Sequence, residues 1–178
     1  ACTPPQQSNI LTIATSANMQ FAMVAIIERF SAQTGIACEL VISSSGKLTA
    51  QIKEGASYDV FLAANMKYPE EIHRSGLSET TPKIYAYGKL VLWSMNTSIS
   101  PSLELLADGS IQHIALANPK TAPYGTAAIA VLHHYKRYDQ IASKLVFGES
   151  IAQTNQFIVS RAAEIGFTSK SVVLSTEM

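Results

Sequence analysis

Hydrophobic and polar positions change their spacing in blocks along the chain from Ile10 onward. Short apolar runs predict strands, whereas apolar residues three and four positions apart predict helices. The pattern predicts a strand over 10–16, followed by a helix over 19–35 that ends at Gly35. The other predicted strands are 37–43, 58–64, 88–95, 112–119, 144–150 and 163–169, and the other predicted helices are 46–55, 67–76, 126–138 and 151–162.

The alternation of strands and helices predicts the α/β class, with a parallel-type sheet covered by helices on both faces. The turn-rich stretch 78–88 interrupts this alternation after three strand–helix units. We therefore expect two lobes with a ligand cleft between them, lobe 1 over 10–85 and lobe 2 over 86–178. Residues 1–9 are polar and contain two prolines, which predicts a disordered leader.

Composition and charge exclude some classes of function but do not identify one. The 178 residues are 47% hydrophobic, and 13 Lys and Arg balance 13 Asp and Glu. Zero net charge argues against a nucleic-acid surface, which needs clustered basic residues. No apolar run has the length of a membrane span. Of the two cysteines, Cys38 lies in a predicted strand and is expected to be buried, and nothing requires a disulfide with Cys2.

Four predicted strands are followed by stretches rich in Ser, Thr, Asn, Gly or Pro that lead into helices: "ATSANMQF", "SSSGKL", "ANPKTAPYGTAA" and "GESIAQT". In open α/β sheets, ligands bind at the carboxyl ends of strands. Free N–H groups and the helix dipole make each helix start a candidate anion site. Ordinary N-capping explains any one of these stretches equally well.

The "SSSGKL" stretch invites comparison with a nucleotide-binding P-loop. That motif requires glycine at position 41 and Ser or Thr at position 48, where this chain has Val41 and Leu48. The magnesium-binding hydroxyl and the glycine of the wide turn are both absent. Serine hydroxyls with helix-start amides suit a small desolvated oxyanion instead. No Ser-His-Asp set or convincing pair of acids is present, so we expect no enzymatic activity.

Several blocks resemble one family closely. "SSSGKLTAQIKEGASYDVFLAAN", "YGKLVLWS", "HIALANPKTAPYGTAA" and "LVFGESIAQTNQF" resemble the periplasmic molybdate/tungstate-binding proteins of ABC transporters. The resemblance runs from about Ile10 to the end of the chain and implies the two-lobed periplasmic-binding-protein fold (type II). Members of that family continue beyond the position of Met178, which implies that a C-terminal return segment of the first lobe is missing here.

The resemblance also implies a ligand site, carried over position by position. Its members are Ala17, Asn18, Ser45, Tyr124 and Ile151, with Ile151 offering only its backbone N–H. These groups would contact the oxygens of the anion, so Asn18, Ser45 and Tyr124 are not direct metal ligands.

Neighbouring positions leave alternatives open. Ser16 competes with Asn18 if the register differs, and Ser44 is a supporting hydroxyl. Some relatives use a tyrosine in the last strand, where this chain has Ser169. Asn65 replaces an acid that is frequent in the family, and we expect no ligand role for it.

The resemblance implies the substrate-binding component of an ABC importer, which captures molybdate or tungstate and needs no cofactor. Its expected partner is a permease in the inner membrane, and the protein is expected to be a periplasmic monomer that binds no nucleic acid. Ala1-Cys2 resembles a processed lipoprotein start, which suggests a lipid anchor on Cys2. The alternatives are a binding protein for sulfate or another oxyanion, an α/β phosphotransferase, and a cytoplasmic sensor domain of the same fold.

Overall fold

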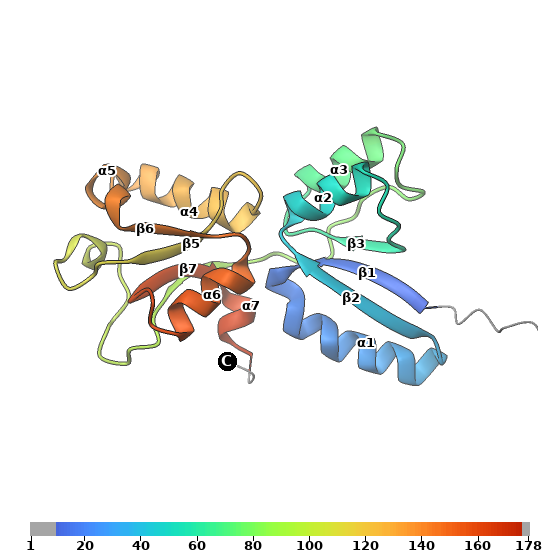
Figure 1. The fold of residues 1–178 in the computed structure, drawn as a ribbon, viewed down its shortest axis with the longest axis horizontal. Coiled ribbons are helices and arrows are strands. Elements are labelled where there is room, and N and C mark those ends of the chain that lie inside the picture. Colours follow the sequence, from blue (N-terminus) through green and yellow to red (C-terminus); the bar gives the residue numbers. More distant parts are fainter. Residues whose placement is uncertain (1–9, 176–178) are drawn as a thin grey trace, which may run out of the picture.

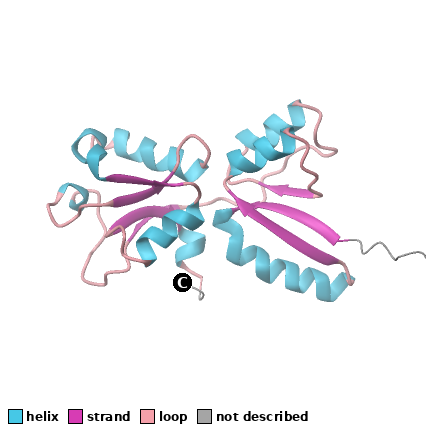
Figure 2. Cartoon of the chain, viewed as in Figure 1, coloured by secondary structure: helices cyan, strands magenta, loops and turns pink. Residues whose placement is uncertain are grey.

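The computed structural model describes residues 10–175 and contains two separate β-sheets, each with helices on both faces (Figures 1 and 2). The strand order is β2-β1-β3 in the first sheet and β4-β7-β5-β6 in the second. The chain passes between the sheets through the coil that joins α3 to β4 (Figure 1). Two α/β halves therefore face each other across a boundary.

The first half has a fully parallel sheet of β1 (Ile10–Ser16), β2 (Ala37–Ser43) and β3 (Val60–Leu62). Its helices are α1 (Gln20–Thr34), α2 (Ser45–Lys53) and α3 (Lys67–Arg74), with a 3-10 turn at Ala17–Met19. The register pairs Ser16 with Ser43. Because the strands are parallel, both serines lie at the carboxyl edge of the sheet, where α1 and α2 begin.

The second half has a mixed sheet. Strands β5 (Ile114–Ala117), β6 (Leu145–Gly148) and β7 (Ile165–Ser169) are parallel, and β4 (Leu90–Trp93) is antiparallel to β7. The helices are α4 (Pro123–His134), α5 (Tyr138–Ile141), α6 (Ile151–Val159) and α7 (Lys170–Val173). Short 3-10 turns occupy Leu105–Ala107 and Ala142–Lys144. Ala117 pairs with Gly148, so β5 and β6 end together.

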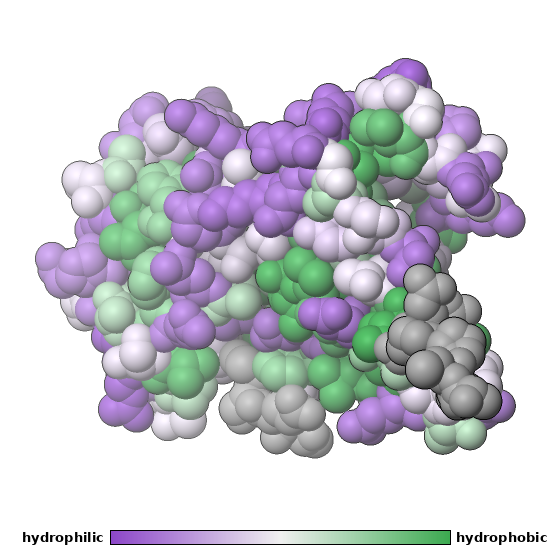
Figure 3. All heavy atoms as spheres, turned by 45° about the vertical axis from the view of Figure 1, so that its right-hand side comes forward, coloured by the Kyte–Doolittle hydropathy of each residue, from purple (hydrophilic) through white to green (hydrophobic). Residues whose placement is uncertain are grey.

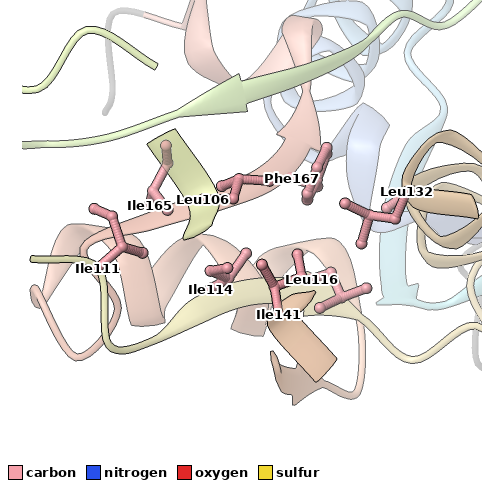
Figure 4. Close-up of a cluster of buried hydrophobic side chains, with 9 residues drawn as sticks. Leu106, Ile111, Ile114, Leu116, Leu132, Ile141, Ile165 and Phe167 are labelled. Carbon is pink, nitrogen blue, oxygen red and sulfur yellow. The ribbon is translucent and has the colours of Figure 1, made fainter. Parts of the chain in front are cut away.

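The second half contains a closed hydrophobic core. Side chains from β5 and β7 meet those of α4, α5 and the 105–107 turn (Figure 4). The cluster consists of Leu106, Ile111, Ile114, Leu116, Ala128, Leu132, Ile141, Ile165 and Phe167, all at most 3% exposed. This dense packing gives the loops of the second half a rigid base.

The first half buries fewer large side chains and leaves more of them at its surface. In α1 only Met23 is buried, and hydrophobic residues reach the surface among hydrophilic ones in the space-filling view (Figure 3). The exposed large hydrophobic residues of this half and the connecting coil are Ile10, Val24, Ile26, Ile36, Ile42, Val60, Leu77, Ile84, Tyr85 and Tyr87. The first half therefore presents uncovered apolar surface.

Most predicted elements are present, within a few residues of their predicted bounds. The expected two-lobed α/β fold is confirmed, with one sheet in each half. One strand departs from the parallel-type pattern, because β4 runs antiparallel to β7. A helical crossover imposes a parallel direction, whereas the coil before β4 does not. Cys38 is only half-buried because β2 is an edge strand. The leader 1–9, including Cys2, lies outside the described residues.

Candidate functional site

The helix starts of the two halves meet at the boundary between them. The backbone N–H of Gly46 in α2 donates to the carbonyl oxygen of Thr121, before α4, at 2.8 Å. Beside this bond, the Lys47 ammonium forms an ion pair with Glu149, which precedes α6. An apolar cluster spans the same boundary and contains Ala17, Ala117, Ala122, Tyr124, Ile151 and Val172. The contacts bring all five predicted site residues to one region, since Asn18 adjoins Ala17 and Ser45 adjoins Gly46.

Ser45 is oriented by lobe 1. It is the first residue of α2 and is fully buried. Its hydroxyl oxygen accepts a hydrogen bond from the Ala64 N–H at 3.0 Å. This bond fixes the oxygen and leaves the hydroxyl hydrogen available to a ligand. The neighbouring Ser44 hydroxyl is also buried and has no hydrogen-bond partner within residues 10–175.

Asn18 lies in the 3-10 turn after β1 and is 7% exposed. Its carbonyl oxygen accepts from the Ser171 hydroxyl at 2.7 Å, and the Ser171 and Ser169 hydroxyls are 3.1 Å apart. The Ser171 hydroxyl therefore connects the Ser169 hydroxyl with the backbone of Asn18 through two hydrogen bonds. The side-chain oxygen of Asn18 is buried without a partner in the described part of the chain. The competing residue Ser16 ends β1 and is 5% exposed.

Tyr124 comes second in α4, after a proline that has no N–H to leave unpaired. Its hydroxyl is buried without a partner among the described residues. Burial raises the pKa of Tyr124 and the nearby Tyr85 raises it further, whereas the Asn18 side chain, which would hydrogen-bond the ionised oxygen, opposes the shift. The hydroxyl is consequently a protonated donor at neutral pH.

Gly88 adjoins the predicted site residue Tyr124, a contact that the sequence did not predict. A Cβ built at Gly88 would overlap the Tyr124 hydroxyl, so the absence of a side chain makes room for that group. The sequence signal was the glycine in "YAYGKL", which looked like an ordinary turn residue. Thr15 and Thr121 were missed as well, and their hydroxyls are buried without partners in the described region.

Ile151 begins α6 and is 4% exposed. Its helix is capped by Ser150, whose hydroxyl accepts from the Gln153 N–H at 3.5 Å. The N–H groups of the first helical turn have no carbonyl partner within the helix, which leaves that of Ile151 available to a ligand. Ala17 begins its own 3-10 turn in the same way and contacts the same apolar cluster.

Every buried polar side chain in residues 10–175 is neutral. The set is Thr15, Ser16, Asn18, Ser44, Ser45, Thr49, Thr154, Asn155, Thr168 and Ser169. Neither a buried cation nor a buried carboxylate belongs to it. Such a region can donate hydrogen bonds to an anion, with helix N-termini adding favourable dipoles.

The geometry of α2 does not form a P-loop. A phosphate-wrapping loop needs several residues between strand and helix, whereas only Ser44 separates β2 from α2. Leu48, at the position of the magnesium-binding hydroxyl, is completely buried. The described residues contain no group of three or more His, Cys, Asp or Glu that could hold a metal ion. Across 10–175, no helix has the length and apolar character to cross a membrane.

A cavity of about 560 Å³ lies beside the site, with Asn18 and Tyr124 in its wall. Most of the wall belongs to the stretch 80–89 and to apolar residues near β3. Asn65 is exposed at this cavity. Ser45 and Ile151 do not line it, so the cavity adjoins the meeting point of the helix starts on the side of Asn18 and Tyr124.

Comparison with known proteins places the chain in a family. The sequence model for "Bacterial extracellular solute-binding protein" matches residues 11–178. The chain belongs to this family. As a solute-binding protein, it is expected to bind its solute unchanged, in agreement with the prediction that it is not an enzyme.

The chain is similar to several curated relatives, among them two molybdate-binding proteins. It is 37% identical over 169 residues to the molybdate-binding protein ModA of Azotobacter vinelandii, covering 94% of this chain and 67% of the relative. It is 33% identical over 174 residues to ModA of Rhodobacter capsulatus, covering 97% and 69%. The chain therefore spans about two thirds of the length of each of these relatives.

Solved structures support the two-lobed binding-protein fold. The periplasmic molybdate-binding protein of Azotobacter vinelandii aligns with a TM-score of 0.84 and 35% identity, covering 89% of this chain and 71% of that one. The sulfate-binding protein SubI of Mycobacterium tuberculosis aligns with a TM-score of 0.72 at 11% identity, covering 91% and 65%. At that identity the second likeness concerns the fold alone.

Proposed function

We propose that this solute-binding protein captures molybdate or tungstate between its lobes as the substrate-binding component of an ABC importer. One observation carries the proposal. Buried hydroxyl groups without partners in the described chain, those of Ser44, Thr121 and Tyr124, gather where the helix starts meet and can donate to an anion. The 37% identity to a molybdate-binding protein supports the choice of ligand.

The proposed site suits a tetrahedral dianion. All four oxygens of molybdate accept hydrogen bonds and none donates. Asn18, Ser45 and Tyr124 would donate from their side chains, and Ala17 and Ile151 from their backbone N–H groups. Hydrogen bonds to charged groups contribute about 1.5–3 kcal/mol each, so a few of them support tight binding without a buried cation.

The same chemistry sets selectivity. Phosphate near neutral pH carries at least one proton and needs an acceptor, which buried carboxylates would supply. No carboxylate is present among the buried residues of the described chain. A neutral acceptor such as the Asn18 side-chain oxygen binds that proton less strongly than a carboxylate, so phosphate is disfavoured. Sulfate is doubly charged and accepts only, like molybdate, so it would be distinguished by its smaller size.

The proposed setting follows the family. We propose that the protein works outside the cytoplasmic membrane as a monomer, delivers its anion to a membrane permease and binds no nucleic acid. A lipid on Cys2 would hold it at the membrane, although Cys2 lies outside the described residues.

Calorimetric titration of the ligand-free protein with molybdate, tungstate, sulfate and phosphate tests the proposal. We expect one-to-one binding of molybdate and tungstate, with sulfate and phosphate much weaker. Tighter sulfate binding would reassign the protein to the sulfate alternative. Binding of ATP with magnesium but of no free oxyanion would refute the proposal and favour the phosphotransferase.

A further inference from the structure

Gly46 occupies a position where the backbone does not require glycine. It is the second residue of α2 and has ordinary helical geometry, unlike Gly35, Gly55 and Gly76, which have positive φ. Glycine in a helix is less stable than alanine because it loses more backbone entropy on folding. A contact outside the helix must therefore account for the missing side chain.

That contact lies on the other lobe. The Gly46 N–H donates to the Thr121 carbonyl oxygen, so the two backbones touch directly. A Cβ built at Gly46 would lie 2.8 Å from that oxygen, 2.9 Å from the Thr121 Cα and 3.1 Å from the side-chain hydroxyl of Tyr68 in its own lobe. Backbone atoms cannot rotate away as a flexible side chain can. A methyl group at this position would force the lobes apart.

A second interlobe contact adjoins the first. Lys47 pairs with Glu149, and their side chains are 44% and 60% exposed. An ion pair this exposed is weak by itself. The pair nevertheless lies close to the proposed anion site, because Lys47 is two residues from Ser45 and Glu149 is two residues from Ile151. Both interlobe contacts thus flank groups of the proposed anion site.

We propose that Gly46, Thr121 and the Lys47–Glu149 pair form an interlobe clasp that holds the lobes closed over the bound anion. The inference rests on the proposed function. Gly46 acts as a positioning residue, since its backbone brings Ser45 and the start of α4 together without requiring a side chain of its own to touch the ligand. The clasp slows release of the anion.

Replacing Gly46 with alanine in the intact protein tests the clasp. We expect molybdate to dissociate roughly 5- to 150-fold faster, the effect of an overpacked contact. The thermal midpoint of the ligand-free protein should stay the same or rise, since alanine favours the helix. Stopped-flow dissociation and thermal denaturation measure the two effects. Gly109→Ala is the matched control, because a Cβ there meets nothing within 4 Å and its φ is ordinary.

Glu149→Gln provides a second test that leaves the backbone intact. Loss of an exposed pair predicts about two- to fivefold faster dissociation. Glu104→Gln is its control, because it removes the same charge from a pair with Arg137, 3.9 Å apart within lobe 2. If Gly46→Ala fails to fold, a Glu149→Gln rate equal to that of Glu104→Gln overturns the clasp.

Different experimental results would refute the clasp and the proposed function. If the unaltered protein binds no molybdate, the proposed function is refuted. If it binds molybdate tightly but Gly46→Ala and Glu149→Gln release it at the unaltered rate, only the clasp is refuted. Compaction on molybdate binding, measured by small-angle scattering, should be reduced in Gly46→Ala and unchanged in Gly109→Ala.

Discussion

Replacement of Tyr124 by phenylalanine separates ligand binding from folding. The substitution removes one oxygen and keeps the ring, which packs in the apolar cluster between the lobes. The hydroxyl has no hydrogen-bond partner in residues 10–175, although it is buried. In the ligand-free protein the hydroxyl therefore stabilises little, whereas in the complex it would donate to an anion oxygen.

The two expected effects have opposite signs. A hydrogen bond to a charged group contributes about 1.5–3 kcal/mol, so the dissociation constant for molybdate should rise by roughly 10- to 150-fold. A buried hydroxyl without a partner is unfavourable, so its removal should leave the free energy of unfolding without ligand unchanged or raise it by up to about 1 kcal/mol.

Calorimetry with molybdate measures the first effect and urea unfolding of the ligand-free protein measures the second. Tyr135→Phe serves as the control, because Tyr135 lies at the end of the same helix and is 57% exposed. It should change neither quantity. Unaltered molybdate affinity in Tyr124→Phe would refute the role of this hydroxyl. A loss of more than about 1 kcal/mol in ligand-free stability would refute the claim that it lacks a partner.

Further perturbations follow from the same contacts. Ser45→Ala should weaken molybdate binding by roughly 10- to 150-fold in calorimetry, and equal affinity would exclude its hydroxyl from the site. Gly88→Ala should weaken binding by about tenfold because its methyl group displaces the Tyr124 hydroxyl. That effect should be smaller in a Tyr124→Phe background, where the nearest ring carbon is 3.1 Å from the added methyl group, and an unchanged effect there would contradict the mechanism. Glu164→Ala should reduce the urea-measured stability by about 0.5–1.5 kcal/mol, because its carboxylate accepts two exposed backbone N–H groups at 3.0 and 2.7 Å. A stability equal to that of the unaltered protein would contradict this. Burial raises the pKa of Tyr124 above its ordinary 10.0, so the unfolded chain ionises first and stability should fall above about pH 10. The fall should be shallower in Tyr124→Phe, and identical pH profiles would refute the shift.

The sequence by itself determined the order and kind of most elements. Hydrophobic periodicity located β1, β2 and α1 within a residue of their bounds, because each of these elements carries its own pattern. The direction of β4 was not determined in this way, because a coil connection carries no directional constraint. The shortest helices, α5 and α7, have too few residues for a period to appear.

The sequence likewise predicted some features of the candidate site and not others. Polar residues at helix starts were visible in the sequence, and the family resemblance selected Asn18, Ser45 and Tyr124 from among them. Tertiary structure alone decided that Gly46 touches Thr121 and that Gly88 makes room for Tyr124. Each of these contacts joins segments that are distant in the chain. The first is a hydrogen bond between two backbones, and the second depends on the missing side chain of Gly88. Local sequence predicts neither contact, because the structural role of a glycine depends on which residues the tertiary fold places next to it.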